Sequence, residues 1–449
     1  MSIGLLLSAR LRRQYAAAEA RRAMGQPRDQ SAAMAQQLAA IRIVWADAVR
    51  DVPYYAALAA SGRAPLDIQT WADVAAIPEL SRQSLQDYPE GFVRRSGSPE
   101  SYVTTGGSTG TPLRIGINQS ERDLMRIVKL AAWQDLGYTS SSRLFIMWGH
   151  FHLLGTGWRG RLLQVRRAIG DAALGYQRVS AYRLSPAIAT AYAEQLIRFR
   201  PAGLIGYASA LDLFGRYAAP FRDRFRALGL RFVLSTSEPP PRPDTVAMLE
   251  DLFACRVVQE YGGAEFGQVA FKIGTAPFSV YSDLGYLEAQ PEKVAEPGAQ
   301  PLLLTALYPR YLPLIRYRCG DAALGPRRWS NGHVERFDAV AGRINDVVQL
   351  ADGDAVHSVA IQHCVVQERS VYNVQMVLTD SGVELSLVTP DPDRVSLEAR
   401  IRSRLRQVHP GLASATFRYV DDLDTNRAGK RRWFIDLRSS SPCAASPAS

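Results

Sequence analysis

The stretch Thr104-Thr105-Gly106-Gly107-Ser108-Thr109-Gly110-Thr111-Pro112 is the most informative segment of this chain. Its three glycines free the backbone to fold tightly, so that successive N–H groups can converge on one point. Its hydroxyl groups add donors around that point, and phosphate oxygens accept many such hydrogen bonds. The stretch has neither the Gly-Lys-Ser/Thr of a Walker loop nor a Gly-x-Gly-x-x-Gly. It therefore predicts a phosphate-binding loop of another kind, with a plain polar surface loop as the alternative.

Composition is that of a globular protein with two or three domains. The chain has 449 residues, of which 47% are hydrophobic and 21% charged, and such a chain can bury substantial cores. No apolar run approaches the roughly 20 residues that a membrane span needs. The four cysteines form no C-x-x-C pair, which is typical of a reducing compartment and gives no zinc or disulfide framework. We therefore expect a cytoplasmic protein without a membrane span.

The formal net charge of +10 raises the alternative of nucleic-acid binding. The arginines, however, are spread through amphipathic segments and are not gathered into one stripe with interleaved aromatic residues. An arginine-rich composition explains the charge more simply, and we expect no nucleic-acid partner.

Apolar runs at 143–148, 203–206, 231–234 and 256–259 indicate buried strands, and helical periodicity fills the intervals between them. This alternation predicts the α/β class, with mostly parallel sheets covered by helices. Ligands of such sheets gather at the loops that leave the strand ends. After Gly342 the pattern changes to two neighbouring strands, a helix and a further strand. The predicted domains are 1–342, a small α+β domain at 343–438, and a disordered tail at 439–449.

Five further segments carry polar residues in turns or at strand ends. They are Ser235–Pro239, Glu260–Gly267, Arg316–Asp321, Gly342–Asp346 and Asn426–Lys430.

In order and spacing, these segments resemble the signature motifs of the AMP-forming adenylating enzymes, a superfamily that includes acyl-CoA synthetases, peptide-synthetase adenylation domains and luciferases. The sequence is most similar to the phenylacetate–CoA ligase-like branch, with its CapK and coenzyme F390 synthetase-like proteins. The similarity extends from about residue 40 to 438. Four further segments support the similarity to this branch: Val52-Pro53-Tyr54-Tyr55, Ile77-Pro78, Tyr88-Pro89 and Leu312-Pro313-Leu314-Ile315-Arg316-Tyr317-Arg318.

The resemblance implies a binding site for ATP. Tyr261 and the turn Ser237-Glu238-Pro239 would border the adenine, and Asp321 would accept hydrogen bonds from the ribose hydroxyls. Arg343 would contact the ribose and a phosphate. The β- and γ-phosphates would be held by Thr105, Gly106, Gly107, Ser108, Thr109, Gly110 and Thr111.

The resemblance also implies the catalytic groups. Glu265 would bind Mg²⁺, a hard cation that takes one or two carboxylates beside phosphate oxygens. Lys430 would bridge the substrate carboxylate and the α-phosphate, where a cation stabilises the charge of an in-line transition state between two anions. Arg343 would assist at the domain junction. The small domain would swing about a hinge at Asn345 and Asp346.

The acid-binding pocket would lie at the strand ends near Trp148, His150, His152, Tyr207 and the Gly262-Gly263 backbone. Aromatic and small residues there favour an aromatic or short apolar acid. The two histidines lack an evident third metal ligand, so we expect them to form hydrogen bonds rather than bind zinc.

Several positions depart from the family pattern. Thr111 replaces a common lysine, and Cys319 replaces a threonine. In the stretch Ala351-Asp352-Gly353-Asp354-Ala355-Val356-His357, Asp352 occupies the position where the family has a glycine that lets pantetheine pass. The expected reaction is activation of a carboxylic acid by ATP, with coenzyme A as the default acceptor. An amine acceptor that yields an amide is the first alternative, and a non-catalytic binding or scaffold subunit is the second. The family also suggests a homodimer.

Overall fold

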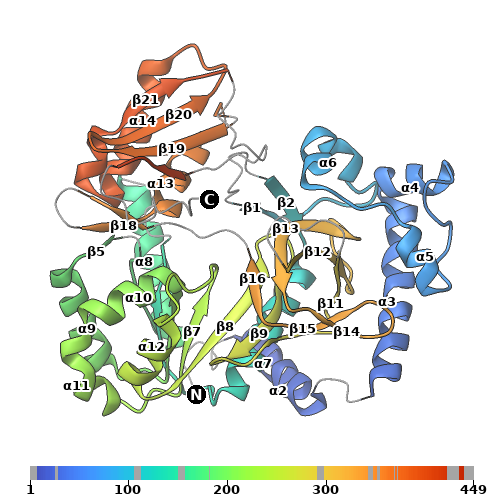
Figure 1. Ribbon diagram of the computed structural model, residues 1–449, viewed down its shortest axis with the longest axis horizontal. Helices are drawn as coiled ribbons and strands as arrows, with labels where there is room; N and C mark the ends of the chain where they lie inside the picture. The colour runs from blue at the N-terminus through green and yellow to red at the C-terminus, as the bar shows by residue number, and fades with distance from the viewer. Residues whose placement is uncertain are drawn as a thin grey trace, which may run out of the picture.

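The computed structural model describes residues 8–25, 29–105, 113–149, 157–181, 183–290, 298–341, 347–350, 354–368, 370–371, 373–421 and 434–438. Its elements form a large N-terminal part around a nine-stranded sheet and a smaller part around a C-terminal four-stranded sheet (Figure 1). Within these ranges, no helix is long and apolar enough to cross a membrane.

The nine-stranded sheet is parallel in one half and antiparallel in the other. Its first five strands run in the same direction, and each of the next four reverses it. The four strands predicted between 143 and 259 are direct neighbours in the parallel half. Across the sheet the order is β4 (Tyr176–Val179), β3 (Leu144–Met147), β6 (Gly203–Tyr207), β7 (Phe232–Thr236), β8 (Arg256–Gly263), β9 (Gly267–Ile273), β10 (Phe278–Val280), β15 (Val334–Phe337) and β14 (Arg327–Arg328).

Helices cover both faces of the parallel half, because successive strand side chains point to opposite faces and both faces are apolar. Phe145 and Met147 pack into a core with one group of helices, whereas Leu144 and Ile146 pack into a core on the opposite face. The first group is α9 (Pro186–Phe199), α10 (Ala208–Tyr217), α11 (Arg222–Arg226) and α12 (Thr245–Phe253), and the second is α2 (Ala9–Met24) and α7 (Gln119–Asp135).

The N-terminal helices pack against a second, antiparallel sheet. Trp45 and Ile41 are buried there together with Leu302 and Leu304, in a core that also reaches the antiparallel half of the first sheet. The sheet contains β11 (Gly285–Ala289), β12 (Ala299–Ala306), β13 (Tyr317–Leu324) and β16 (Ala339–Ala341), and the helices are α3 (Gln30–Asp51), α4 (Pro53–Ala60), α5 (Trp71–Ala76), α6 (Arg82–Asp87) and η1 (Pro89–Phe92).

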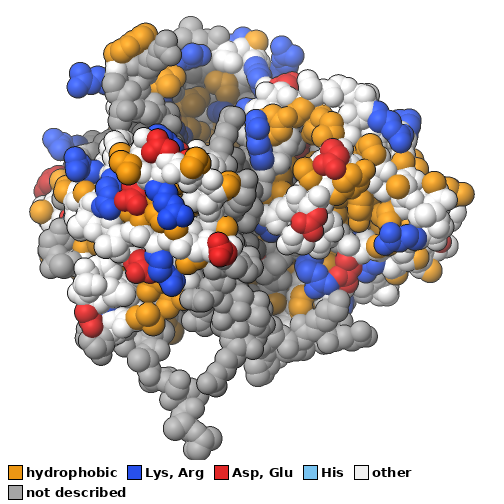
Figure 2. All heavy atoms as spheres, turned by 90° about the horizontal axis from the view of Figure 1, so that it is seen from above, with side chains coloured by type: hydrophobic (Ala, Val, Ile, Leu, Met, Phe, Trp, Pro, Cys, Tyr) orange, Lys and Arg blue, Asp and Glu red, His pale blue; other side chains and the backbone are white. Residues whose placement is uncertain are grey.

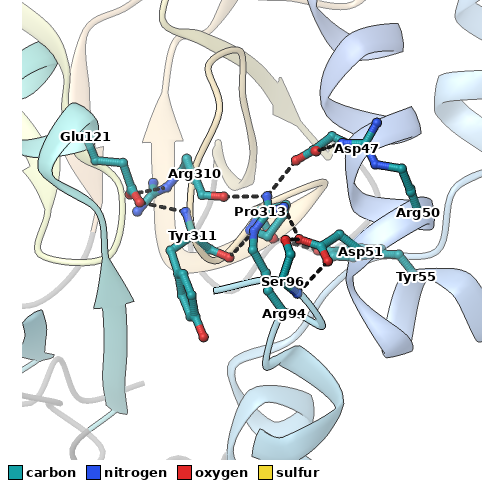
Figure 3. Close-up of polar contacts among 10 residues, drawn as sticks. All are labelled: Asp47, Arg50, Asp51, Tyr55, Arg94, Ser96, Glu121, Arg310, Tyr311 and Pro313. Atoms are coloured by element: carbon teal, nitrogen blue, oxygen red, sulfur yellow. Dashed lines mark hydrogen bonds and ion pairs between the residues drawn. The ribbon is translucent and has the colours of Figure 1, made fainter. Parts of the chain in front are cut away.

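A polar network joins these helices to the loop before β13 (Figure 3). The Arg94 guanidinium contacts Asp47 at 2.6 Å and Asp51 at 2.8 Å, and donates to the backbone carbonyls of Arg310 and Tyr311. At the other end, Glu121 of α7 accepts from the Tyr311 N–H at 2.6 Å and lies 3.2 Å from Arg310 Nε. Because both side chains of the Glu121–Arg310 pair are fully buried, removing either one would leave an uncompensated charge.

The C-terminal part contains the predicted strand pair, whose strands β19 and β20 are antiparallel, and the predicted helix, α14. A short sheet links it to the N-terminal part, because Ala355 of β18 pairs with Leu184 of β5. The elements are β17 (Val347–Gln349), β18 (Ala355–His357), β5 (Arg183–Leu184), α13 (Ser358–Val366), β19 (Asn373–Thr379), β20 (Gly382–Val388), α14 (Arg394–Val408), η4 (Pro410–Ser414), β21 (Thr416–Tyr419) and β22 (Phe434–Asp436).

The predicted α/β class is confirmed, and an antiparallel half that the sequence patterns did not indicate extends it. The proposed domain boundary at 342–343 and the tail at 439–449 lie outside the described residues. Both therefore stay predictions.

Basic side chains are dispersed on the face of the molecule that is seen from above in Figure 2. On the part of this face that the structure describes, Lys and Arg lie among hydrophobic and uncharged atoms and do not form one stripe. Elsewhere, surface arginines pair with acids, as Arg224 does with Glu194 and Arg226 with Asp251. Such pairing provides no evidence for an extended anionic partner.

Candidate active site

A cleft of ≈ 1580 Å³ lies where the parallel strands end. Its walls come from the segments that follow β3, β6, β7 and β8, and from β13 and one side of α7. The carboxyl ends of parallel strands meet at one edge of a sheet, which explains why polar segments far apart in the sequence converge here. The cleft is therefore the candidate active site.

The glycine-rich stretch connects two strands that pair directly. β1 (Ser101–Thr105) and β2 (Leu113–Ile117) are antiparallel, with Thr105 opposite Leu113. Thr105 thus ends a strand at the base of the predicted loop. The other expected residues of that loop, together with several others, lie outside the described residues: Gly106, Gly107, Ser108, Thr109, Gly110, Thr111, His150, His152, Arg343, Asn345, Asp346 and Lys430.

Glu265 lies in the turn between β8 and β9 and faces the cleft. It is only 8% exposed, and its Oε1 accepts from Arg82 Nη1 at 2.8 Å. Arg310 donates a hydrogen bond to the Glu265 backbone carbonyl, which ties this turn to the buried network of Figure 3. Neither arginine was expected from the sequence, because no local pattern links α6 or the loop before β13 to this turn.

The position of Glu265 fits a magnesium ligand. Within the described part of the chain, Oε2 of Glu265 has no hydrogen-bond partner, and no group of three or more His, Cys, Asp or Glu could hold a metal ion by itself. Mg²⁺ commonly takes one or two carboxylates and completes its shell with phosphate oxygens and water. The residues present fit that arrangement.

Gly262 and Gly263 are required by the tight β8–β9 hairpin. A Cβ at Gly262 would lie 2.3 Å from the carbonyl oxygen of Gly267, and a Cβ at Gly263 would lie 2.7 Å from the Phe266 ring. The atom that a Cβ at position 262 would meet belongs to the backbone, which cannot move aside as the end of a flexible side chain can. Any residue other than glycine at position 262 would therefore open the hairpin. The pair thus leaves a bare backbone surface in the cleft wall.

Tyr261 and Asp321 form a hydrogen-bonded pair between β8 and β13. The Tyr261 hydroxyl donates to Asp321 Oδ2 at 3.2 Å and lies 3.6 Å from Cys319 Sγ. Burial, with the nearby thiol and carboxylate, raises the pKa of Tyr261 well above its usual range, so the phenol stays a donor. The ring is only 7% exposed and contacts Phe337 edge-on, and this packing holds the phenol in place to orient Asp321.

The turn after β7 has a strained backbone. Ser237 has φ 76°, a left-handed conformation that costs a residue other than glycine about 1 kcal/mol or more. Oε1 of Glu238 accepts from the N–H and the hydroxyl of Ser209, at 2.9 and 2.5 Å, near the N-terminus of α10. This carboxylate therefore anchors the turn to the helix, while Ser237, Glu238 and Pro239 line the cleft.

Trp148 and Tyr207 form an aromatic wall. Trp148 directly follows β3, and Tyr207 is the last residue of the neighbouring strand β6. The centroids of the two rings are 4.5 Å apart. Both line the cleft beside Gly262 and Gly263, so four of the expected acid-binding residues are together.

One wall of the cleft was not predicted from the sequence. α7 contributes Arg126, Lys129 and Trp133, spaced so that they share one helical face. Glu260 lines the same cleft, and burial raises its pKa although the nearby Lys129 ammonium lowers it. Lysine is rare in this sequence, which was a signal that Lys129 deserved attention. That Glu260 is its neighbour, however, is determined only by the tertiary structure.

Two comparisons place the chain among known proteins. It is 22% identical over 273 residues to protein CapK of Staphylococcus aureus, a match that covers 58% of this chain and 58% of CapK. The match thus spans less than two thirds of the relative. No family model matches the chain.

Solved structures of 2-hydroxyisobutyryl-CoA ligase have the same fold. One, in complex with 2-HIB-AMP and CoA in the thioesterification state, is 17% identical with a TM-score of 0.56, covering 92% of this chain and 91% of that one. A second, in an open conformation with the same ligands, is 18% identical with a TM-score of 0.52, covering 89% and 90%. The chain therefore has the fold of this CoA ligase, and its sequence similarity to CapK agrees with the CapK-like resemblance that the motifs indicated.

Proposed function

We propose that this protein is an ATP-dependent ligase that converts a carboxylic acid to an acyl-adenylate and transfers the acyl group to coenzyme A. The observation that carries the proposal is the single cleft that contains the Glu265 turn, the Tyr261–Asp321 pair and the Trp148–Tyr207 wall. The ligands of the similar ligase, 2-HIB-AMP and CoA, support the same class of reaction.

The nucleotide would lie along the ends of β7, β8 and β13. Asp321, oriented by Tyr261, would accept hydrogen bonds from the two ribose hydroxyls, and the turn at Ser237 would border the adenine. The loop that begins at Thr105 would hold the β- and γ-phosphates. Glu265 would hold Mg²⁺, which when bound neutralises phosphate charge.

The first step joins the acid to the nucleotide. A carboxylate oxygen of the acid attacks the α-phosphorus, the bond from that phosphorus to the bridging oxygen breaks, and pyrophosphate leaves with the electron pair. Lys430 would neutralise the two anions as they approach, an effect whose loss typically costs about 10²–10³ in rate. Gly262 and Gly263 leave room for the acyl-phosphate beside the backbone.

The second step releases AMP. The sulfur of coenzyme A attacks the acyl carbon and loses its proton, the carbon–oxygen bond to AMP breaks, and a thioester forms. An amine acceptor would react in the same way to give an amide. Asp352, which lies in the sequence where the family has glycine, keeps this second candidate open.

Acid-dependent exchange of labelled pyrophosphate into ATP tests the first step. We expect exchange with at least one acid from a panel of aromatic and short acyl acids. Lys430→Ala should abolish exchange, whereas Arg224→Ala, which removes one exposed positive charge that does not line the cleft, should not. No exchange with any acid would favour the non-catalytic alternative. The product mass after addition of coenzyme A or amines identifies the acceptor.

A further inference from the structure

Five polar side chains that line the cleft contain buried atoms without a hydrogen-bond partner among the described residues. These atoms are Gln14 Oε1, Arg126 Nε, Trp133 Nε1, Glu260 Oε1, and both side-chain polar atoms of Gln268. Leaving one such group unpaired costs about 1–3 kcal/mol, so buried polar groups are normally satisfied by protein, water or ligand. Their concentration in one cleft indicates a polar occupant.

Four elements contribute these side chains, and Gln14 comes from α2. Arg126 and Trp133 lie two turns apart on α7, with Lys129 between them on the same face. Glu260 comes from β8 and Gln268 from β9, and the two strands pair directly. Trp133 and Gln14 are only 7% and 6% exposed, so the cleft is sheltered from solvent around these two side chains, whereas Lys129 is exposed.

The charges of this compartment do not balance. Burial raises the pKa of Glu260 and the Lys129 ammonium opposes that shift, so Glu260 supplies at most one negative charge beside the positive charges of Lys129 and Arg126. Arg126 has no carboxylate within 4 Å among the described residues, and the titratable groups that it affects are the hydroxyls of Tyr138 and Tyr176. Burial raises the pKa of both tyrosines, so they stay neutral.

Other arginines of the same cleft have acidic partners. The guanidinium of Arg178 lies 2.9 Å from Asp171, and Arg10 pairs with Asp123. Arg126 is different because its partly buried guanidinium Nε is unpaired. A sheltered cation is costly without an anion, which the cleft can receive from its ligand.

Resting on the proposed function, we propose that the acid substrate is a dicarboxylic acid. One carboxylate is adenylated near Glu265, and the second is bound by Arg126 with hydrogen bonds from Trp133 and Gln268. The carbon skeleton between the two carboxylates lies against Trp148 and Tyr207. The sequence predicted an aromatic or short apolar acid, and this assignment keeps such a skeleton between the two carboxylates. It adds a second carboxylate, which the residue types at the strand ends did not indicate.

Matched pairs of acids test this assignment by pyrophosphate exchange. Each pair has the same skeleton with and without the second carboxylate, such as phenylacetate with 4-carboxyphenylacetate and hexanoate with adipate. We expect at least one dicarboxylate to have a kcat/KM tenfold or more above that of its partner. In Arg126→Gln, that value should fall about 10–100-fold, as loss of a charge-assisted hydrogen bond predicts, while the value for the monocarboxylate changes less than threefold.

Two variants serve as controls. Arg126→Lys keeps the charge and should restore part of the preference, and Arg224→Gln, an exposed arginine paired with Glu194, should leave it unchanged. If the wild type exchanges pyrophosphate but prefers the monocarboxylate of every pair, or if Arg126→Gln impairs both acids equally, the assignment is overturned and the proposed function stands.

A binding measurement keeps the test independent of catalysis. In titration calorimetry with the dicarboxylates and no ATP, the wild type should bind at least tenfold more tightly than Arg126→Gln. If the wild type shows no exchange with any acid, the proposed function fails, and this binding ratio alone decides whether Arg126 binds a carboxylate of the ligand. Equal binding by the two proteins, or none by the wild type, overturns the assignment.

Discussion

Arg82 Nη1 lies 2.8 Å from Glu265 Oε1, although 183 residues separate the two in the chain. Arg82 is the first residue of α6, and Glu265 lies in the β8–β9 turn, so the pair joins the N-terminal helices to the cleft. Both side chains are largely buried, at 15% and 11% exposure. A metal ion at Glu265 would share this carboxylate with an arginine.

Replacing Arg82 should therefore alter both stability and metal dependence. Arg82→Gln leaves a buried carboxylate without its cation, and we expect the free energy of unfolding without nucleotide to fall by about 2–3 kcal/mol. Pyrophosphate exchange should reach half its maximum at a lower Mg²⁺ concentration, because the competing cation is gone. Urea denaturation and a Mg²⁺ titration measure the two effects. Unchanged Mg²⁺ dependence in Arg82→Gln, with unimpaired exchange in Glu265→Gln, would remove Glu265 as the metal ligand.

The Tyr261 hydroxyl should matter for nucleotide binding more than for the acid. Tyr261→Phe keeps the ring in its core but removes the donor to Asp321, a loss of about 0.5–1.5 kcal/mol. We expect the KM for ATP to rise about two- to tenfold, with kcat and the KM for the acid within about twofold. Tyr286→Phe is the matched control, because its hydroxyl donates to the Asn331 carbonyl outside the cleft. Equal changes in the two variants would contradict a role of Tyr261 in orienting Asp321.

His333 should make the fold sensitive to acid. Burial alone lowers the pKa of His333 from 6.5 to about 3, and its Nδ1 accepts from the Leu287 N–H at 3.2 Å. The unfolded chain therefore binds one more proton at this residue between these two values. The associated stability is complete above about pH 6.5 and is lost as the pH falls toward 3, by about 1.4 kcal/mol per pH unit.

Urea unfolding of the wild type and His333→Gln from pH 7.5 to 4.5 measures this contribution. The variant should be less stable than the wild type at pH 7.5, because the imidazole contacts Trp329 and Tyr286 are lost. Its stability should decline less steeply between pH 6.5 and 4.5. Parallel slopes in this range would mean that His333 titrates normally in the folded protein.

The β5–β18 pairing gives a test of domain movement. Opposed residues of antiparallel strands have Cα atoms about 4.5–5.5 Å apart, within reach of a disulfide. In Leu184→Cys/Ala355→Cys, oxidation should therefore cross-link the two parts of the chain at this pair. If the C-terminal part swings during each cycle, thioester formation should fall at least tenfold on oxidation and recover on reduction.

The two single-cysteine variants control for the native thiols. Of these, Cys319 and Cys364 are buried and Cys255 is partly exposed. Full turnover by a protein that is completely cross-linked at this position would show that the β5–β18 pairing persists throughout the cycle.

Sequence patterns were sufficient wherever local chemistry determines the structure. The apolar runs that form β3, β6, β7 and β8 bury both of their faces when they lie parallel between two layers of helices. Their parallel arrangement, and a cleft at their carboxyl ends, could therefore be predicted from the sequence. The Tyr261–Asp321 pair and the Trp148–Tyr207 wall were each assembled from residues expected in the site. The antiparallel strands after Gly267 were not expected, because short strands with mixed patterns give a weak signal.

The amino-acid sequence by itself determined the α/β class and the segments that meet at the ends of the parallel strands, because hydrophobic periodicity and turn residues act over a few neighbouring positions. Tertiary structure alone decided that Arg82 pairs with Glu265, that Arg310 supports the same turn, and that Arg126 faces the cleft without an acidic partner among the described residues. Such pairings depend on distances between segments up to 183 residues apart, which only the packed chain defines.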